Sequence, residues 1–63
     1  MPKFIKVTTL AGETVLINTE NIFSVCSDNN GTEIFLIKDN YQTCKRLKEA
    51  IAEIESMLEV VND

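Results

Sequence analysis

The chain has 63 residues, of which 44% are hydrophobic and 25% are charged, and its formal net charge is −4. This length allows one small domain of marginal stability, and the composition does not suit a disordered tail. Histidine is absent and ten acidic residues face six basic ones, which removes the commonest general base and argues against a nucleic-acid binder.

The first half of the chain is typical of β-strands separated by short turns. β-branched and aromatic residues predict a first strand over residues 4–10. Gly12 supplies the turn to a second strand over residues 14–18, and the polar corner 18–21 precedes a third strand that begins at Ile22.

The dipeptide Asn30-Gly31 is the clearest turn signal, because Asn and Gly tolerate the positive φ angles of a type I′ turn. We therefore predict that the strands over 22–27 and 32–38 form a hairpin. Asp39-Asn40 is a second turn of the same chemistry, which leads into a short edge strand over residues 41–43.

From about Cys44 the apolar residues recur every three or four positions, the spacing of one helical face. Thr43 is the predicted N-cap of this helix. Its apolar stripe consists of Leu47, Ile51, Ile54, Leu58 and Val61. The predicted fold is α+β: residues 1–63 form one domain, an antiparallel meander of four or five strands followed by one C-terminal helix packed on one sheet face.

The predicted strands are apolar on both faces, whereas one helix covers only one of them. The uncovered face would present a patch large enough to need a partner. We predict an oligomer interface consisting of Phe4, Leu16, Phe35 and Ile37. A homo-oligomer follows, most simply a two-fold dimer. The alternative is a strongly curled sheet that folds over its own second face, as in a small barrel.

Basic residues crowd the predicted helix start and acidic residues follow, the reverse of the order that a helix dipole prefers. The simplest interpretation is a solvated face. One alternative is an anion site in which Lys45, Arg46 and Lys48 assist the free N–H groups of the helix start. Another is an antiparallel helix–helix contact that joins the basic end of one helix to the acidic end of its partner.

Cys26 and Cys44 are the only cysteines, too few for the disulfide framework of a small secreted domain. We predict reduced thiols, buried or half buried, that serve packing. The alternative is a redox-sensing pair in which Lys45 and Arg46 lower the pKa of Cys44.

No catalytic, cofactor-binding or metal-binding residues are predicted, and no cofactor is expected. The serines lack a histidine to activate them, and two cysteines without histidine do not make a standard zinc site. No apolar run is long enough for a signal peptide or a spanning helix, so we expect a cytoplasmic protein without membrane insertion.

The chain carries a succession of short motifs: a strand ending in Ala-Gly-Glu, then Ile-Asn-x-x-x-Ile, then a short polar hairpin. The motifs lie in four stretches: Phe4-Ile5-Lys6-Val7-Thr8-Thr9-Leu10-Ala11-Gly12-Glu13, Val15-Leu16-Ile17-Asn18, Asn21-Ile22-Phe23-Ser24-Val25 and Gly31-Thr32-Glu33-Ile34. The pattern resembles the FlbD/SwrD family of small bacterial proteins and covers most of residues 3–51. The chain departs from the family at Cys44-Lys45-Arg46, where a Lys-Glu-Ser stretch is common. The resemblance implies an association with flagellar operons and no enzymatic activity.

The sequence therefore predicts a non-catalytic interaction module, FlbD-like in fold, that is a homo-oligomer and binds another protein. One alternative is a phage-encoded inhibitor of a host enzyme or defence system, which the small size and acidity suit equally well. A further alternative is a sensor of a phosphate-bearing ligand that uses Lys45, Arg46 and Lys48.

Overall fold

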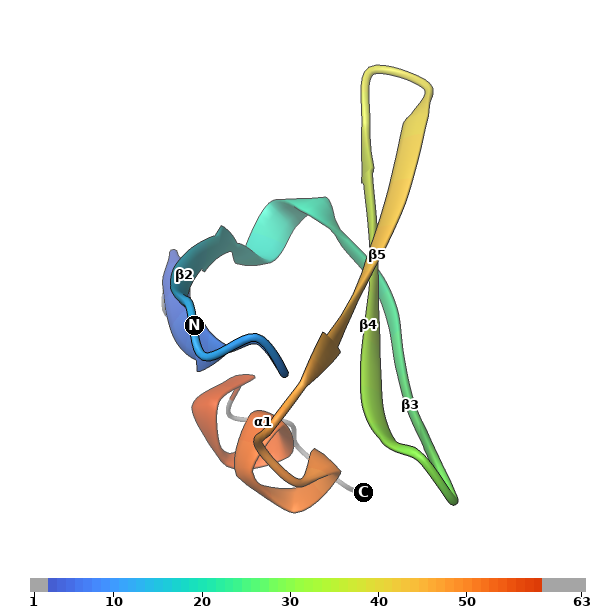
Figure 1. Cartoon of the computed structure of the whole chain (residues 1–63). Coiled ribbons are helices and arrows are strands. Elements are labelled where there is room, and N and C mark those ends of the chain that lie inside the picture. Colours follow the sequence, from blue (N-terminus) through green and yellow to red (C-terminus); the bar gives the residue numbers. More distant parts are fainter. Residues whose placement is uncertain (1–2, 59–63) are drawn as a thin grey trace, which may run out of the picture.

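The computed structural model describes residues 3–58, which form five strands, one 3-10 helix and one α-helix (Figure 1). In chain order the elements are β1 (Phe4–Thr8), β2 (Thr14–Asn18), η1 (Thr19–Asn21), β3 (Ile22–Asp28), β4 (Gly31–Lys38), β5 (Tyr41–Leu47) and α1 (Ile51–Leu58). The predicted α+β fold, an antiparallel strand meander followed by a C-terminal helix, is confirmed.

The strands belong to two antiparallel sheets, β1-β2 and β3-β4-β5. The chain passes from one to the other through η1. The side-chain oxygen of Asn18 accepts a hydrogen bond from the N–H of Glu20 at 2.9 Å and so caps this helical turn. The polar corner expected at this position therefore ends one sheet and starts the next.

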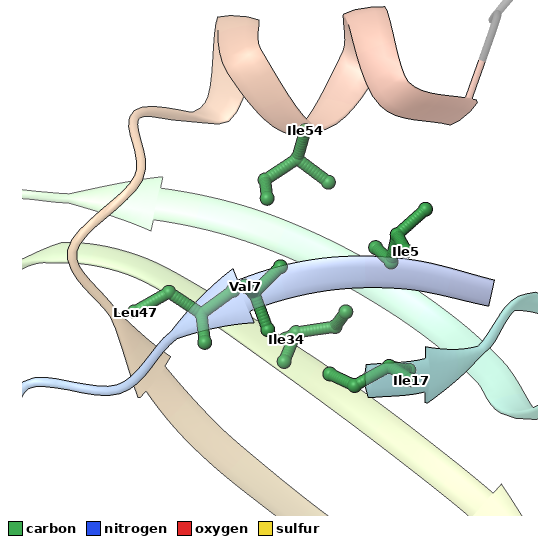
Figure 2. Close-up of a cluster of buried hydrophobic side chains, with 6 residues drawn as sticks. All are labelled: Ile5, Val7, Ile17, Ile34, Leu47 and Ile54. Carbon is green, nitrogen blue, oxygen red and sulfur yellow. The ribbon is translucent and has the colours of Figure 1, made fainter. Parts of the chain in front are cut away.

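The two sheets pack against each other through their inner faces, which are the faces that hold the buried core (Figure 2). The helix α1 adds one fully buried side chain, Ile54, which points toward the strands, and its Met57 and Leu58 pack against the core while partly exposed. The core consists of Ile5, Val7, Ile17, Ile34, Leu47 and Ile54. Since side chains alternate along a strand, each sheet also has an outer face directed away from this core.

One corner joins the two sheets edge to edge, where the end of β1 meets the end of β5. Thr9 pairs with Leu47 in an isolated antiparallel bridge. The N–H of Lys48 donates to the carbonyl of Thr8 at 2.8 Å, and the N–H of Leu10 donates to the carbonyl of Arg46 at 3.2 Å. The five strands are therefore closer to the curled-sheet alternative than to a flat sheet covered by a helix.

The predicted helix start at Cys44 is wrong, because α1 begins at Ile51. Residues 44–47 continue β5, where they pair with β4, so Thr43 is a strand residue rather than an N-cap. The start of α1 is capped instead by Glu53, whose carboxylate accepts a hydrogen bond from the backbone N–H of Ala50 at 3.3 Å. Val61, the last residue of the predicted stripe, lies outside the described residues.

The predicted hairpin of β3 and β4 is confirmed, but the predicted type of its turn is wrong. β3 and β4 are joined by Asn29-Asn30, and the positive φ of +112° falls on Gly31 alone, so this turn is not type I′. Among the described residues other than glycine, only Asp39 and Asn40 have positive φ, at 50° and 67°. These two residues form the loop between Lys38 and Tyr41, which is the φ pattern of a type I′ turn.

We expect Gly31→Ala to lower the free energy of unfolding by about 1 kcal/mol or more, because a Cβ atom disfavours positive φ. The nearest atom to such a Cβ is the Leu47 carbonyl oxygen at 3.9 Å, an ordinary contact, so the cost is conformational. Asn29→Ala, in the same turn at negative φ, is the matched control. Equal urea midpoints for the two variants would contradict the assignment.

Candidate functional site

The described residues expose as many large apolar side chains as they bury. Six apolar side chains form the core, and six large ones are exposed. The exposed set is Phe4, Leu10, Leu16, Phe23, Ile37 and Tyr41, with Leu16 66% and Tyr41 73% exposed. Exposed apolar side chains indicate association when they gather in a contiguous patch, so their distribution over the surface decides what they mean.

The predicted interface residues lie on two surfaces rather than one. Phe4 and Leu16 alternate with the core residues of β1 and β2 and lie on the outer face of that sheet, both exposed. Phe35, half buried, and Ile37, 41% exposed, lie on the outer face of the three-stranded sheet. The sequence did not predict two sheets, which is why the four residues were expected to form one patch.

The outer face of the three-stranded sheet combines an apolar centre with a polar end at which one arginine pairs with two carboxylates. Phe35 pairs with Ser24 on one side and with Cys44 on the other. At the polar end, the Arg46 guanidinium donates to both carboxylate oxygens of Asp28, at 2.9 and 3.2 Å, and lies 3.4 Å from Glu33. The hydrogen bond from Arg46 lowers the pKa of Asp28.

A groove of about 250 Å³ lies between β2 and the inner face of the β4–β5 hairpin. The tip of this hairpin extends well beyond the rest of the chain (Figure 1). The groove is lined by Val15, Leu16, Ile17, Asn18, Asn21, Leu36, Lys38, Tyr41, Thr43 and Lys45. Its lining therefore contains two lysines and no acidic residue, in a chain whose net charge is −4.

The structure does not bring the three predicted anion-binding residues together. Lys45 and Arg46 are neighbours in β5 and so point to opposite faces, Lys45 into the groove and Arg46 to its carboxylate partners. Lys48 follows β5 and is exposed. Since none of them lies in α1, the described helix offers no basic end to an anion or to an antiparallel helix.

The expectation that Cys26 and Cys44 are buried or half buried is wrong, because both are exposed. They lie on β3 and β5, on either side of β4, so two strand spacings of about 4.8 Å each separate them. That distance exceeds the roughly 7 Å Cα separation that a disulfide permits. The folded chain therefore does not join its own cysteines.

The electrostatics of Cys44 argue against the lowered pKa on which the redox-sensing alternative depends. A hydrogen bond to the Glu33 carboxylate raises the pKa of Cys44, and this effect outweighs the nearby charges of Arg46 and Lys45. A raised pKa reduces the thiolate population at neutral pH and with it the reactivity.

Glu49, which lies in the segment that the sequence predicts to be helical, holds the corner between the two sheets. Its carboxylate accepts a hydrogen bond from the backbone N–H of Thr8 at 2.9 Å, and this bond lowers its pKa. The two residues are 41 positions apart, and no local pattern in the sequence signals their contact.

Among residues 3–58, no three Cys, Asp or Glu side chains gather as a metal site, and no helix is both long and apolar enough to cross a membrane. Comparison of the chain with protein-family models, with curated proteins and with solved structures gives no match. The candidate functional features are therefore the two outer faces and the groove.

We expect Cys44 to be alkylated slowly by iodoacetamide near pH 7 despite its exposure, because Glu33 raises the pKa of its thiol. Glu33→Gln removes the carboxylate charge and should shift the rate profile of Cys44 to lower pH. Mass spectrometry of the labelled peptides separates Cys44 from Cys26. An unchanged profile in Glu33→Gln would contradict the assigned cause.

We expect Glu49→Ala to lower the free energy of unfolding by about 1 kcal/mol at pH 7, the typical net value of one hydrogen bond. The folded-state pKa of Glu49 lies below its ordinary value of 4.5, so its contribution is present above that value. This contribution is lost as the pH falls through the folded-state pKa of Glu49. The difference in unfolding free energy between Glu49→Ala and the parent should therefore become smaller at low pH. Urea midpoints at pH 7 and pH 3 measure this, with the exposed Glu55→Ala as control.

Proposed function

We propose that this protein is a non-catalytic interaction module that forms a homodimer in the cytoplasm and presents its remaining surface to another protein. The observation that carries the proposal is the balance of apolar side chains, six buried and six exposed. A core this small rarely provides more than about 3–5 kcal/mol of stability without a partner. The resemblance to FlbD-like proteins, which are not known as enzymes, agrees with this function.

The outer face of the three-stranded sheet is the surface best suited to a second copy. Phe35 and Ile37 lie on its central strand. Since both are already partly buried, each would gain only part of the about 1.5–3 kcal/mol that full burial of an exposed side chain provides. Its charged residues are already paired within one chain through Arg46. A two-fold contact here buries the same patch on both copies, and the one negative charge that Arg46 leaves uncompensated lies at the polar end, away from Phe35 and Ile37.

The outer face of the β1-β2 sheet is less suited to self-association. Lys6 pairs with Leu16 and lies on the same outer face as Phe4. No salt bridge of Lys6 occurs among the described residues. A two-fold contact over this face would bring two uncompensated lysines together, which costs free energy.

Light scattering coupled to gel filtration at tens of micromolar should give about twice the monomer mass of 7.1 kDa. Ile37→Glu and Phe35→Glu place a charge in the proposed interface and should shift the mass to the monomer. Ile37→Glu is the safer variant for folding, because Ile37 is already 41% exposed.

Phe4→Glu is the matched control, since it makes the same kind of change on the other sheet, and it should remain dimeric. A parent mass of 7.1 kDa would contradict the homodimer. If Phe4→Glu were monomeric and Ile37→Glu dimeric, the contact would lie on the β1-β2 sheet, which would contradict the proposed interface.

A further inference from the structure

β2 has a free backbone edge on the side away from β1. At one end of the β1-β2 hairpin, the N–H of Thr9 donates to the carbonyl of Glu13. At the other end, the N–H of Thr19 donates to the carbonyl of Lys3. Hydrogen-bonded pairs alternate with unbonded pairs along an antiparallel ladder. The N–H and carbonyl groups of Leu16 therefore point away from β1, and so do those of Thr14 and Asn18.

The same alternation is verified on the opposite edge. Thr8 pairs with Thr14 in an unbonded pair, so its N–H and carbonyl must point away from β2. They do: the N–H donates to Glu49 at 2.9 Å and the carbonyl accepts from Lys48 at 2.8 Å. No described strand pairs with β2 on its free side, so Leu16 offers one donor and one acceptor there.

The groove lies directly beside this free edge. One wall is β2, and the floor is formed by inner-face side chains of the β4–β5 hairpin, among them Leu36, Lys38, Tyr41 and Lys45. The β1-β2 sheet is one strand narrower than the sheet on which it packs. The groove therefore occupies the place where a third strand, added to β2, would lie.

The lining specifies the chemistry of such a strand. Leu36 and Tyr41 provide apolar contact, and Lys38 and Lys45 provide positive charge without an acidic neighbour in the lining. Alternate side chains of an added strand would face this floor. An extended segment whose inward residues are apolar and acidic matches it.

We propose that the groove binds an extended, acidic and apolar segment of a partner protein as a third strand on the free edge of β2. The proposal rests on the proposed function as an interaction module and assigns the partner surface to a specific site. A second copy of the chain fits the groove less well. Its edge strand β2 carries no carboxylate, and β3 carries only Asp28, which is held by Arg46.

The probe is the capped nine-residue peptide Thr-Val-Thr-Glu-Thr-Val-Thr-Glu-Thr. In an extended strand its valine and glutamate side chains share one face. We expect saturable binding by isothermal titration calorimetry, and slower hydrogen exchange of the Leu16 amide by NMR. The same peptide with lysine in place of glutamate should bind roughly tenfold more weakly or not at all.

Two further comparisons separate strand addition from nonspecific charge attraction. Lys38→Glu should weaken binding roughly tenfold, whereas Lys48→Glu, an equal charge change outside the groove, should not. Backbone N–H groups of successive strand residues point to opposite edges. N-methylation of all threonines therefore blocks donation along one edge of the peptide, and N-methylation of all valines and glutamates blocks it along the other edge. One methylated peptide should bind and the other should not.

Absence of peptide binding at millimolar concentration would overturn the proposal, and so would equal binding by both methylated peptides. A dimer that Lys38→Glu converts to a monomer would assign the groove to a second copy, which also overturns it. The light-scattering mass of the parent is measured separately. A monomeric parent that binds the peptide contradicts the homodimer alone, and a dimer that binds no peptide contradicts the groove alone.

Discussion

The corner between β1 and β5 is the constraint on which the rest of the structure depends. Hydrogen bonds from Lys48 to Thr8, from Leu10 to Arg46 and from Thr8 to Glu49 join the two sheets there. This junction holds the inner faces together, so that core residues from both sheets meet Ile54 of the helix. The pairing with β5 engages the outer edge of β1, and it therefore leaves β2 as the open edge of its sheet.

Elements that depend on neighbouring residues were predictable from the sequence, and those that depend on distant partners were not. The strand 14–18 has the predicted bounds because a glycine turn and a polar corner limit it on both sides. Residues 44–47 are compatible with either a strand or a helix, and pairing with β4 decides between them. Leu47 is a core residue in both cases, so the sequence identified its burial and misplaced its element.

The same distinction applies to the candidate site. Period-two alternation separated Phe4, Leu16 and Ile37 from the core side of their strands, and all three are exposed. Which sheet each strand joins depends on the turn at Asn18 and on the bridge between Thr9 and Leu47, and neither is visible in a local pattern. The groove follows from this division into sheets of unequal width, so no motif in the sequence could have located it.

An open strand edge is a hazard for a small protein, because it can pair with the edge of another copy. Proteins usually protect such edges with charges, proline or a bulge. β2 carries none of these, since its sequence is Thr-Val-Leu-Ile-Asn. The strand is only five residues long, which limits the number of hydrogen bonds that a second edge can form with it. The lysines of the groove attract an acidic segment, whereas β2 of a second copy carries no carboxylate to meet them. Charge complementarity would thus favour a foreign acidic strand over the chain's own edge.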